Sequence, residues 1–388
     1  MEIFNTIIGA SAEGNFYFRR PYLDARLWKH IQNGSHILVS APRRIGKTSF
    51  LLNICNLCKD SYHAKYHITQ SVNRPNEFFK RLYKSLLEEC TIHQNMWESI
   101  GEILKKNKIE RVGTSGVELN HADLDYFEEF RRLINKIPIS KKLVFIIDEF
   151  SEALENIIND QGDNAGQLFL HQNRELRQDK NISNKIQFIY SGSIGLGNIT
   201  ERICAIKSIN DLTDFPIPPL SREETFAMID QVTVSPELIF DEKVKQYLMR
   251  RIHWLMPFYL QIILDEIEDI LLKTGGLLKV DKKIVDRAID EALKRRNYFE
   301  HWHTRLRTAF KGKDYTFAKE VLNAASKAQT GINKNQIFDL AKKYELEDDH
   351  NIILRTLEYD GYLTPDAQKI FVFNSPLLKT WWERNIAI

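Results

Sequence analysis

The chain carries the sequence HILVSAPRRIGKTSFLL at residues 36–52, and its organisation can be worked out from this segment. The apolar run at 37–39 predicts a short buried strand, and the apolar residues from Phe50 onward predict a helix. Between them, residues 41–48 fit the phosphate-binding pattern G-x-x-x-x-G-K-[ST], except that Ala41 replaces the first glycine. The motif therefore has the preceding strand and the following helix that phosphate binding requires.

This loop predicts a site for the phosphates of a nucleotide. Main-chain N–H groups point at the ligand in such loops, and the helix N-terminus adds positive potential. Lys47 is expected to reach the β- and γ-phosphates, and the Thr48 hydroxyl is expected to bind Mg²⁺. Arg43 and Arg44 either screen phosphate charge or meet a partner. The predicted nucleotide-binding residues of the loop are Pro42, Arg43, Arg44, Ile45, Gly46, Lys47, Thr48 and Ser49.

A second motif, LVFIIDE at residues 143–149, supports the first. Five apolar residues in a row are typical of a central parallel strand that is buried on both faces. Two carboxylates follow the strand. In a phosphate-loop ATPase, the first holds the Mg²⁺ shell and the second polarises the attacking water, so these roles are expected of Asp148 and Glu149. A chance Gly-Lys-Thr at a strand-to-helix turn would not explain this pair.

Composition sets wide limits on the class of protein. The 388 residues suffice for two or three domains, and 43% hydrophobic with 27% charged residues is ordinary for a globular protein. A net charge of +2 does not by itself indicate nucleic acid. No run of eighteen apolar residues predicts a membrane span, no basic leader is seen, and four cysteines indicate a reducing cytoplasm. Cys55 and Cys58 favour core packing over zinc or redox chemistry.

The first 219 residues predict an α/β phosphate-loop ATPase domain with a parallel sheet and right-handed crossovers. Its ligand would lie beyond the carboxyl ends of the strands. Pro216 assigns the last strand to an edge. The expected strands are 36–40, 64–69, 143–147, 186–190 and 214–217, and the expected helices include 75–90, 124–137 and 164–180.

The rest of the chain predicts two further domains. A capping box at 221–224 opens a helical lid, assigned to 220–300, with further helices at 241–253, 257–273 and 281–297. Residues 301–388 predict a winged-helix domain, because three helices precede a hairpin. Its expected elements are helices at 315–328, 333–344 and 348–360, hairpin strands at 362–364 and 369–373, and a final helix at 377–386. The segment His301-Trp302-His303 is expected to be helix surface.

Segments 41–49, 145–150 and 188–193 together resemble the archaeal-type ATPase family, which belongs to the STAND group of AAA+-related phosphate-loop ATPases. Segment 16–20 resembles the family's N-terminal motif near the adenine, and 255–261 resembles its lid motif. The resemblance implies ATP and Mg²⁺ as ligands, and a C-terminal winged helix. It also implies Pro257 at the adenine, and Ser191 or Ser193 as a sensor of the γ-phosphate or the water; a simple strand-end turn is the alternative for the serines.

The arginines predict slow turnover. Relatives often place an arginine finger just before the fifth strand, but residues 208–213 contain no arginine. Such a finger raises the rate by several orders of magnitude, so intrinsic hydrolysis is expected to be slow, as in a switch. Arg174 and Arg177 could substitute, although an exposed helix face explains both more simply. Arg202 and Lys207 are expected to be surface charges.

The C-terminal domain raises the question of DNA binding. The helix before the hairpin, 348–360, holds four carboxylates and one arginine, which opposes binding to phosphates. Residues 294–388 hold 16 Lys and Arg against 12 Asp and Glu, a balance of +4. We therefore expect a cytoplasmic, ATP-dependent molecular switch whose winged helix contacts a protein partner, another copy of the chain or its own ATPase domain. A DNA-binding ATPase of the origin-recognition or transposition type is the alternative.

Overall fold

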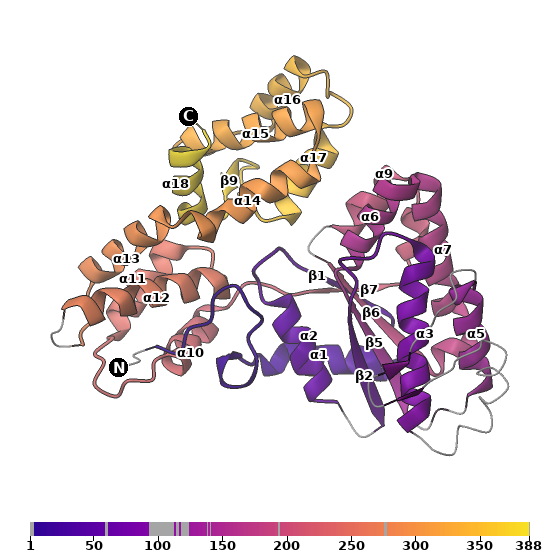
Figure 1. Ribbon diagram of the computed structural model, residues 1–388. Coiled ribbons are helices and arrows are strands. Elements are labelled where there is room, and N and C mark those ends of the chain that lie inside the picture. The colour runs from indigo at the N-terminus through magenta and orange to yellow at the C-terminus, as the bar shows by residue number, and fades with distance from the viewer. Residues whose placement is uncertain are drawn as a thin grey trace. The chain divides into compact units, whose positions relative to one another are not determined.

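The structure is a computed structural model that describes residues 4–58, 61–92, 112–113, 116–117, 124–137, 139, 141–192, 195–274 and 278–387 (Figure 1). The chain forms two compact units. The sheet unit consists of Pro21–Ser40 and Phe50–Pro216. The loop unit consists of Met1–Arg20, Ala41–Ser49 and Ile217–Ile388, so the phosphate-binding motif belongs to the same unit as the C-terminal half of the chain.

The sheet unit is built on five parallel strands in the order β2-β5-β6-β1-β7. Their bounds are β1 (Ile37–Ser40), β2 (Tyr62–Ile68), β5 (Lys142–Asp148), β6 (Ile186–Gly192) and β7 (Thr213–Pro216). All seven residues of β6 are buried, as are the last six of β5. The predicted α/β class is therefore confirmed, and β7 lies at an edge as Pro216 predicts.

Helices cover both faces of this sheet (Figure 1). On one face, alternate residues of β5, namely Leu143, Phe145 and Ile147, join a single apolar core with α3, α5, α6 and α7. On the other face, α1 and α2 pack together, with Asn53 Nδ2 donating to Asp24 Oδ1 at 3.3 Å. The helices are α1 (Pro21–Gln32), α2 (Lys47–Asn56), α3 (Pro75–Ile92), α5 (Tyr126–Lys136), α6 (Phe150–Gln161), α7 (Asp163–Gln178), α8 (Lys180–Ser183) and α9 (Leu196–Arg202).

Two details of the sheet unit differ from the predicted elements. Helix α6 begins directly after β5, and only one residue, Gly162, separates it from α7. Gly162 has φ +83°, a value that glycine adopts easily and that ends the first helix. Helices α1 and α9 were also missed. The short antiparallel pair β3 (Val112–Gly113) and β4 (Gly116–Val117) falls in a region that the sequence left unassigned.

The loop unit is mainly helical. The predicted capping box is confirmed, since Ser221 and Glu224 satisfy each other's backbone N–H groups at the start of α10. Asp241 and Asp281 cap α11 and α13 as expected. The helices are α10 (Arg222–Val232), α11 (Glu242–Ile252), α12 (Pro257–Thr274), α13 (Lys282–Lys294), α14 (Arg296–Ala309), α15 (Gly312–Lys327), α16 (Lys334–Lys343), α17 (His350–Tyr359) and α18 (Pro376–Asn385).

Residues 312–387 form what we call the C-terminal module. Three helices, α15 to α17, precede the hairpin of β8 (Leu363–Pro365) and β9 (Phe371–Phe373), and α18 packs against α15. This is the predicted order, while membership of the winged-helix class stays a prediction. Trp382 Nε1 donates to Asn323 Oδ1 at 3.0 Å, which ties α18 to α15.

Helix α14 corrects one expectation. The predicted helix 281–297 is two helices, and α14 continues to Ala309. Trp302 is buried rather than on a helix surface, because Phe299, Trp302 and Leu306 share the apolar face of α14.

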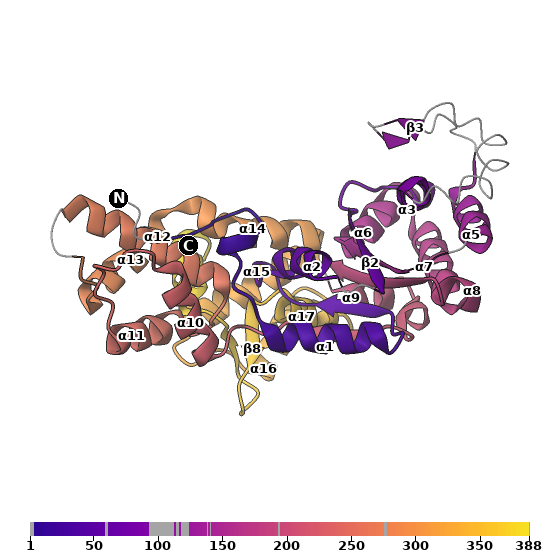
Figure 2. The ribbon, with the colours of Figure 1, turned by 90° about the horizontal axis from the view of Figure 1, so that it is seen from below.

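Figure 2 shows the same elements from below. Among the described helices, none has the length and apolar character that crossing a membrane needs.

Candidate functional site

The loop at 41–46 joins β1 to α2 and has the backbone of a tight turn. Gly46 has φ +96° and Arg44 has φ +66°, so two of its residues lie in the left-handed region. Ala41 is not among the residues with positive φ, which explains why alanine is tolerated where the motif usually has glycine. The loop therefore needs a glycine at position 46 but not at position 41.

Lys47 is the first residue of α2, and its side chain is buried over the loop. Its Nζ donates to the carbonyl oxygens of Ala41 at 2.9 Å and Pro42 at 3.4 Å. Thr48, the predicted Mg²⁺ ligand, is half-buried in the first turn of the same helix. Lys47 thus holds its ammonium group over the loop that the sequence assigns to phosphate.

The N-terminal segment reaches the loop. Ser49 Oγ accepts a hydrogen bond from the backbone N–H of Ala12 at 2.8 Å. Upstream, the backbone N–H of Ile7 donates to Gln261 Oε1 of α12 at 3.1 Å. In the predicted N-terminal motif, Arg20 forms a two-pronged pair with Glu224, at 2.9 Å for each contact. The contact of this motif with adenine stays a prediction.

Pro257 begins α12, and the residue after it contacts the loop. The Arg44 guanidinium lies 4.9 Å from the centroid of the Phe258 ring, a cation–π contact. The His301 ring lies edge-on to the same Phe258 ring, with 5.7 Å between the ring centroids. Arg44 is therefore packed within its own unit, and the role of Pro257 at adenine stays a prediction.

His301 is a half-buried titratable group, whereas the sequence assigned it to the surface of a helix. Burial lowers its pKa to about 3, and the charges of Arg44 and Arg43 act in the same direction. Both ring nitrogens are buried, and the backbone of Tyr298 opposes the lowering of the pKa. Burial, followed by the charge of Arg43, also lowers the pKa of Arg44. Burial, with the loop arginines acting in the same direction, thus favours the neutral form of His301.

A buried ion pair lies near the loop. Arg305 Nε of α14 contacts Asp360 Oδ2 at 2.8 Å, and less than 5% of each side chain is exposed. Burial raises the pKa of Asp360, while Arg305, Arg43 and Lys47 oppose the rise. Asp360 was counted among the carboxylates of the predicted recognition helix, and the structure instead buries it against a cation. No local pattern signals this pair, because 55 positions separate its members.

The carboxylate of Asp148 lies at the carboxyl end of β5, where the sequence predicts a Mg²⁺ ligand. Only 2% of the residue is exposed, and three donors hold its side chain. The Ser191 hydroxyl and the backbone N–H of Glu149 (3.0 Å) donate to Oδ1, and the Tyr66 hydroxyl donates to Oδ2 at 2.6 Å. Tyr66 was not predicted to belong to the site. It lies near the carboxyl end of β2, the strand that pairs with β5.

Glu149 directly follows Asp148 and is half-buried at the N-cap position of α6. Its φ of 59° and ψ of 34° are left-handed, so the chain turns from strand to helix within one residue. Two residues later, Ser151 packs against Gly192, where an added Cβ would lie 2.3 Å from Ser151 Oγ. The carboxylates are thus positioned by a tight contact between the ends of β6 and the start of α6.

Three further residues were predicted to act at or near the site. Ser191 is buried and bonded to Asp148, and its role as a sensor stays a prediction. Ser193 lies outside the described residues. Arg177 is not on an exposed face: it is buried, pairs with Asp211 (Nε–Oδ2, 2.7 Å) and donates to Ser208 O at 2.6 Å. Its guanidinium is therefore committed to its own chain.

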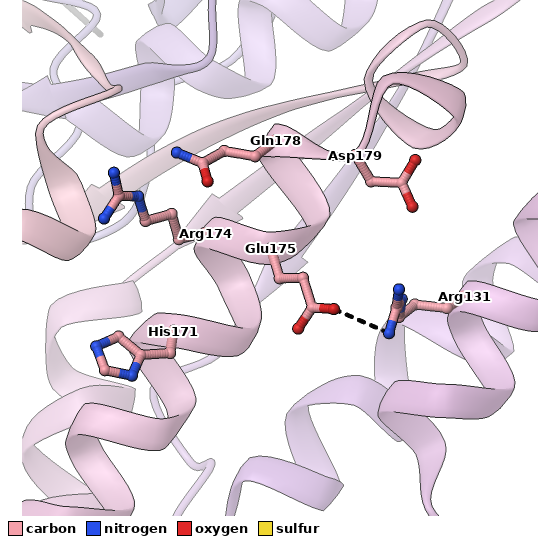
Figure 3. Close-up of a pocket in the computed structure, with 6 residues that line it drawn as sticks. All are labelled: Arg131, His171, Arg174, Glu175, Gln178 and Asp179. Carbon is pink, nitrogen blue, oxygen red and sulfur yellow. Dashed lines mark ion pairs between the residues drawn. The ribbon is translucent and has the colours of Figure 1, made fainter.

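Arg174 lines an open pocket of about 480 Å³ on α5 and α7 (Figure 3). Both acidic and basic side chains line it, and Arg131 pairs with Glu175 at 2.9 Å. The lining is Arg131, His171, Arg174, Glu175, Gln178 and Asp179. Elsewhere, neither Cys55 nor Cys58 forms a disulfide bond within the described part of the chain. The described ranges contain no group of three or more His, Cys, Asp and Glu side chains that could hold a metal.

Solved structures with the same architecture are known. A Walker-type ATPase of Pyrococcus abyssi is similar over 97% of this chain and 98% of its own, with a TM-score of 0.63 and 13% identity. The ORC2 protein of Aeropyrum pernix, in ADPNP and ADP complexes, is similar over 95% and 92%, with a TM-score of 0.52 and 12% identity. No protein-family model and no curated protein sequence matches. The chain has the phosphate-loop NTPase fold of these ATPases.

Proposed function

We propose that this chain is a cytoplasmic ATPase that binds ATP with Mg²⁺ and hydrolyses it slowly. The single observation that carries the proposal is the loop at 41–48. It combines a left-handed Gly46, a helix N-terminus and a buried Lys47 whose ammonium lies over the loop. Each of these features favours the binding of a polyphosphate.

The hydrogen-bond acceptors of Lys47 explain why the loop would bind a nucleotide. Its ammonium donates to two neutral carbonyl oxygens of its own loop, those of Ala41 and Pro42. Phosphate oxygens are charged acceptors, and hydrogen bonds to charged acceptors are roughly twice as strong as neutral ones. A nucleotide therefore offers Lys47 better partners at little conformational cost. The N-terminus of α2 adds favourable potential for the same anion.

The protein offers oxygen donors for the cation, which is the set that Mg²⁺ prefers. Asp148 would supply a carboxylate oxygen and Thr48 a hydroxyl. The strands β1 and β5 are parallel and only β6 separates them, so the loop and Asp148 both follow carboxyl ends of one sheet. Hydrogen bonds from Ser191 and Tyr66 orient the Asp148 carboxylate, as second-sphere donors do at metal sites. When bound, Mg²⁺ neutralises charge on the phosphates.

Glu149 is the proposed base. Its position after Asp148 and its partial exposure let the carboxylate accept a proton from water, which needs a group that is ionised at neutral pH. Arg177 is not expected to act as a finger, since it is paired with Asp211. Turnover should then be slow, as for a switch that a partner accelerates.

The proposed domains are an ATPase domain at 1–219, a lid at 220–300 and a winged helix at 301–388. In this proposal the nucleotide state changes the lid, and the lid repositions the C-terminal module toward a protein partner or a second copy. The order of helices and hairpin in the module supports the winged-helix assignment. Membership of the STAND group is proposed on the sequence motifs alone.

Lys47→Ala tests the phosphate site. Titration calorimetry with ATP and Mg²⁺ should show binding to the wild type and none to this variant. Lys29→Ala, which removes an exposed lysine of α1, serves as the matched control and should bind normally. Wild-type affinity in a folded Lys47→Ala protein would overturn the proposal. Hydrolysis assays with and without duplex DNA separate the switch from the alternative, a DNA-binding ATPase.

A further inference from the structure

The segment 360–362 seats the C-terminal module against the rest of the loop unit. Gly361 has φ +83°, and a Cβ added there would lie 2.3 Å from the Trp254 ring, just before α12. The Tyr362 hydroxyl donates to the carbonyl oxygen of Trp302 in α14 at 2.5 Å. Beside these contacts, Asp360 pairs with Arg305 of α14. The module is therefore docked by close packing and by one buried ion pair.

The charge of Asp360 is only partly used by this docking. Its Oδ2 contacts Arg305, whereas its Oδ1 is buried and accepts no hydrogen bond from the described residues. A buried carboxylate with one oxygen unsatisfied is costly unless other positive charge is near. The loop packs against the same helix as Asp360: Arg44 lies over the Phe258 ring, Phe258 contacts His301, and His301 precedes Arg305 by about one turn of α14. Further positive charge therefore comes from the loop, where Arg43 and Lys47 oppose the rise in the pKa of Asp360 that burial causes.

The same two cations belong to the proposed phosphate site. A bound polyphosphate would bring several negative charges to Lys47 and Arg43. The negative phosphates would offset the positive charge that Lys47 and Arg43 present to Asp360. Little solvent screens charges in a buried setting, so this effect on Asp360 would be strong. The positive charge that offsets the cost of burying the Asp360 carboxylate would then be weaker. The packing around Gly361 and Tyr362 would not change.

We propose that Asp360 and the phosphates of the nucleotide compete for the positive charge of the loop, so that nucleotide binding loosens the docking of the C-terminal module. The proposal rests on the proposed nucleotide site and adds the residue that couples this site to the module. Coupling of this kind is reciprocal, so the docked module must also weaken nucleotide binding by the same factor.

Asp360→Asn tests the competition directly, because it removes the charge and keeps the shape. Calorimetric titration with ATP and Mg²⁺ should show an affinity about tenfold higher than that of the wild type, within the usual range of coupling between sites. Asp348→Asn makes the same charge change at an exposed position of the same module and should bind like the wild type. Unchanged or weaker binding by Asp360→Asn would refute the competition.

Hydrogen exchange measures the docking itself. In the wild type, ATP and Mg²⁺ should speed the exchange of amides in α17 and in the hairpin β8–β9. In Asp360→Asn, these amides should exchange faster before nucleotide is added, and the nucleotide should change them little. If Asp360→Asn does not fold, the double variant Arg305→Met, Asp360→Leu replaces the pair by apolar groups at little or no cost in stability. It should bind ATP more tightly than the wild type, and its exchange in α17 should not respond to the nucleotide.

The two proposals fail in different ways. If the wild type does not bind ATP, or if Lys47→Ala binds as tightly as the wild type, the phosphate site itself is wrong. If the wild type binds ATP through Lys47 but exchange in α17 does not respond, the nucleotide site stands and the competition is refuted.

Discussion

Gly192 follows Ser191 at the end of β6, and we expect Gly192→Ala to destabilise the fold by about 1–3 kcal/mol, the usual cost of overpacking a core. The new Cβ would lie 2.3 Å from Ser151 Oγ, 2.7 Å from Ser151 Cβ and 3.2 Å from Ser151 N. Both residues are buried, so neither can swing into solvent. Relief requires the end of β6 to move away from the start of α6.

That movement bears on the site, since Ser191 donates to Asp148 and Ser151 lies two residues after Glu149. The affinity for ATP with Mg²⁺ should therefore fall together with stability. Chemical denaturation gives the free energy of unfolding. For a domain of 150–250 residues, each 1 kcal/mol should lower the melting temperature by about 2–4 °C.

A double-mutant cycle identifies the cause. Ser151→Gly removes the two nearest atoms, so it should offset much of the cost of Gly192→Ala, with a coupling energy between about 0.5 and 3 kcal/mol. Gly197→Ala is the control: a Cβ there meets nothing within 4 Å, and alanine in α9 should be neutral or slightly stabilising. A neutral Gly192→Ala, or additive effects of the two substitutions, would refute the reasoning.

Three further predictions concern hydrolysis, pH and DNA. Glu149→Gln should keep ATP binding and lower turnover by at least about a hundredfold in a phosphate-release assay, and wild-type turnover would mean that another base acts. Burial, followed by the charge of Arg177, lowers the pKa of His36 to about 4 from 6.5. Because the unfolded chain then binds the extra proton, stability should fall as pH drops from about 6.5 to about 4, by up to about 3 kcal/mol, and His36→Gln should flatten this slope in denaturation curves. Replacing Asp348 and Asp349 by lysine should raise affinity for duplex DNA in a salt-dependent way if α17 faces a groove, and unchanged affinity would remove the helix from such an interface.

The parts of the fold that the sequence predicts are those set by local patterns. The buried strands, the turn at Gly46 and the cap at Ser221 each depend on residues within a few positions of one another. The helix predicted at 164–180 corresponds to α7, whereas α6 was not predicted. Gly162, between the two helices, is the kind of residue that ends a helix.

The parts that the sequence does not predict depend on distant partners. The sequence predicts that Arg177 lies on an exposed helix face. In the structure it pairs with Asp211, which is 34 positions away in the chain. The sequence places Asp360 among the acids of the predicted recognition helix. In the structure it is buried and paired with Arg305 of another helix. In both cases a charged residue looks the same in sequence whether solvent or a partner surrounds it. Tertiary contacts, not propensity, decide between these states.

The position of β1 in the sheet has a consequence for synthesis. Ile37 is hydrogen-bonded in register with Ile189 on one side and with Thr213 on the other, and no earlier strand touches β1. As the chain leaves the ribosome, β1 must wait until about half of the protein has been made before its first neighbour, β6, exists. Pairing at such long sequence separation is slow, so the nascent chain should need protection from aggregation during this delay.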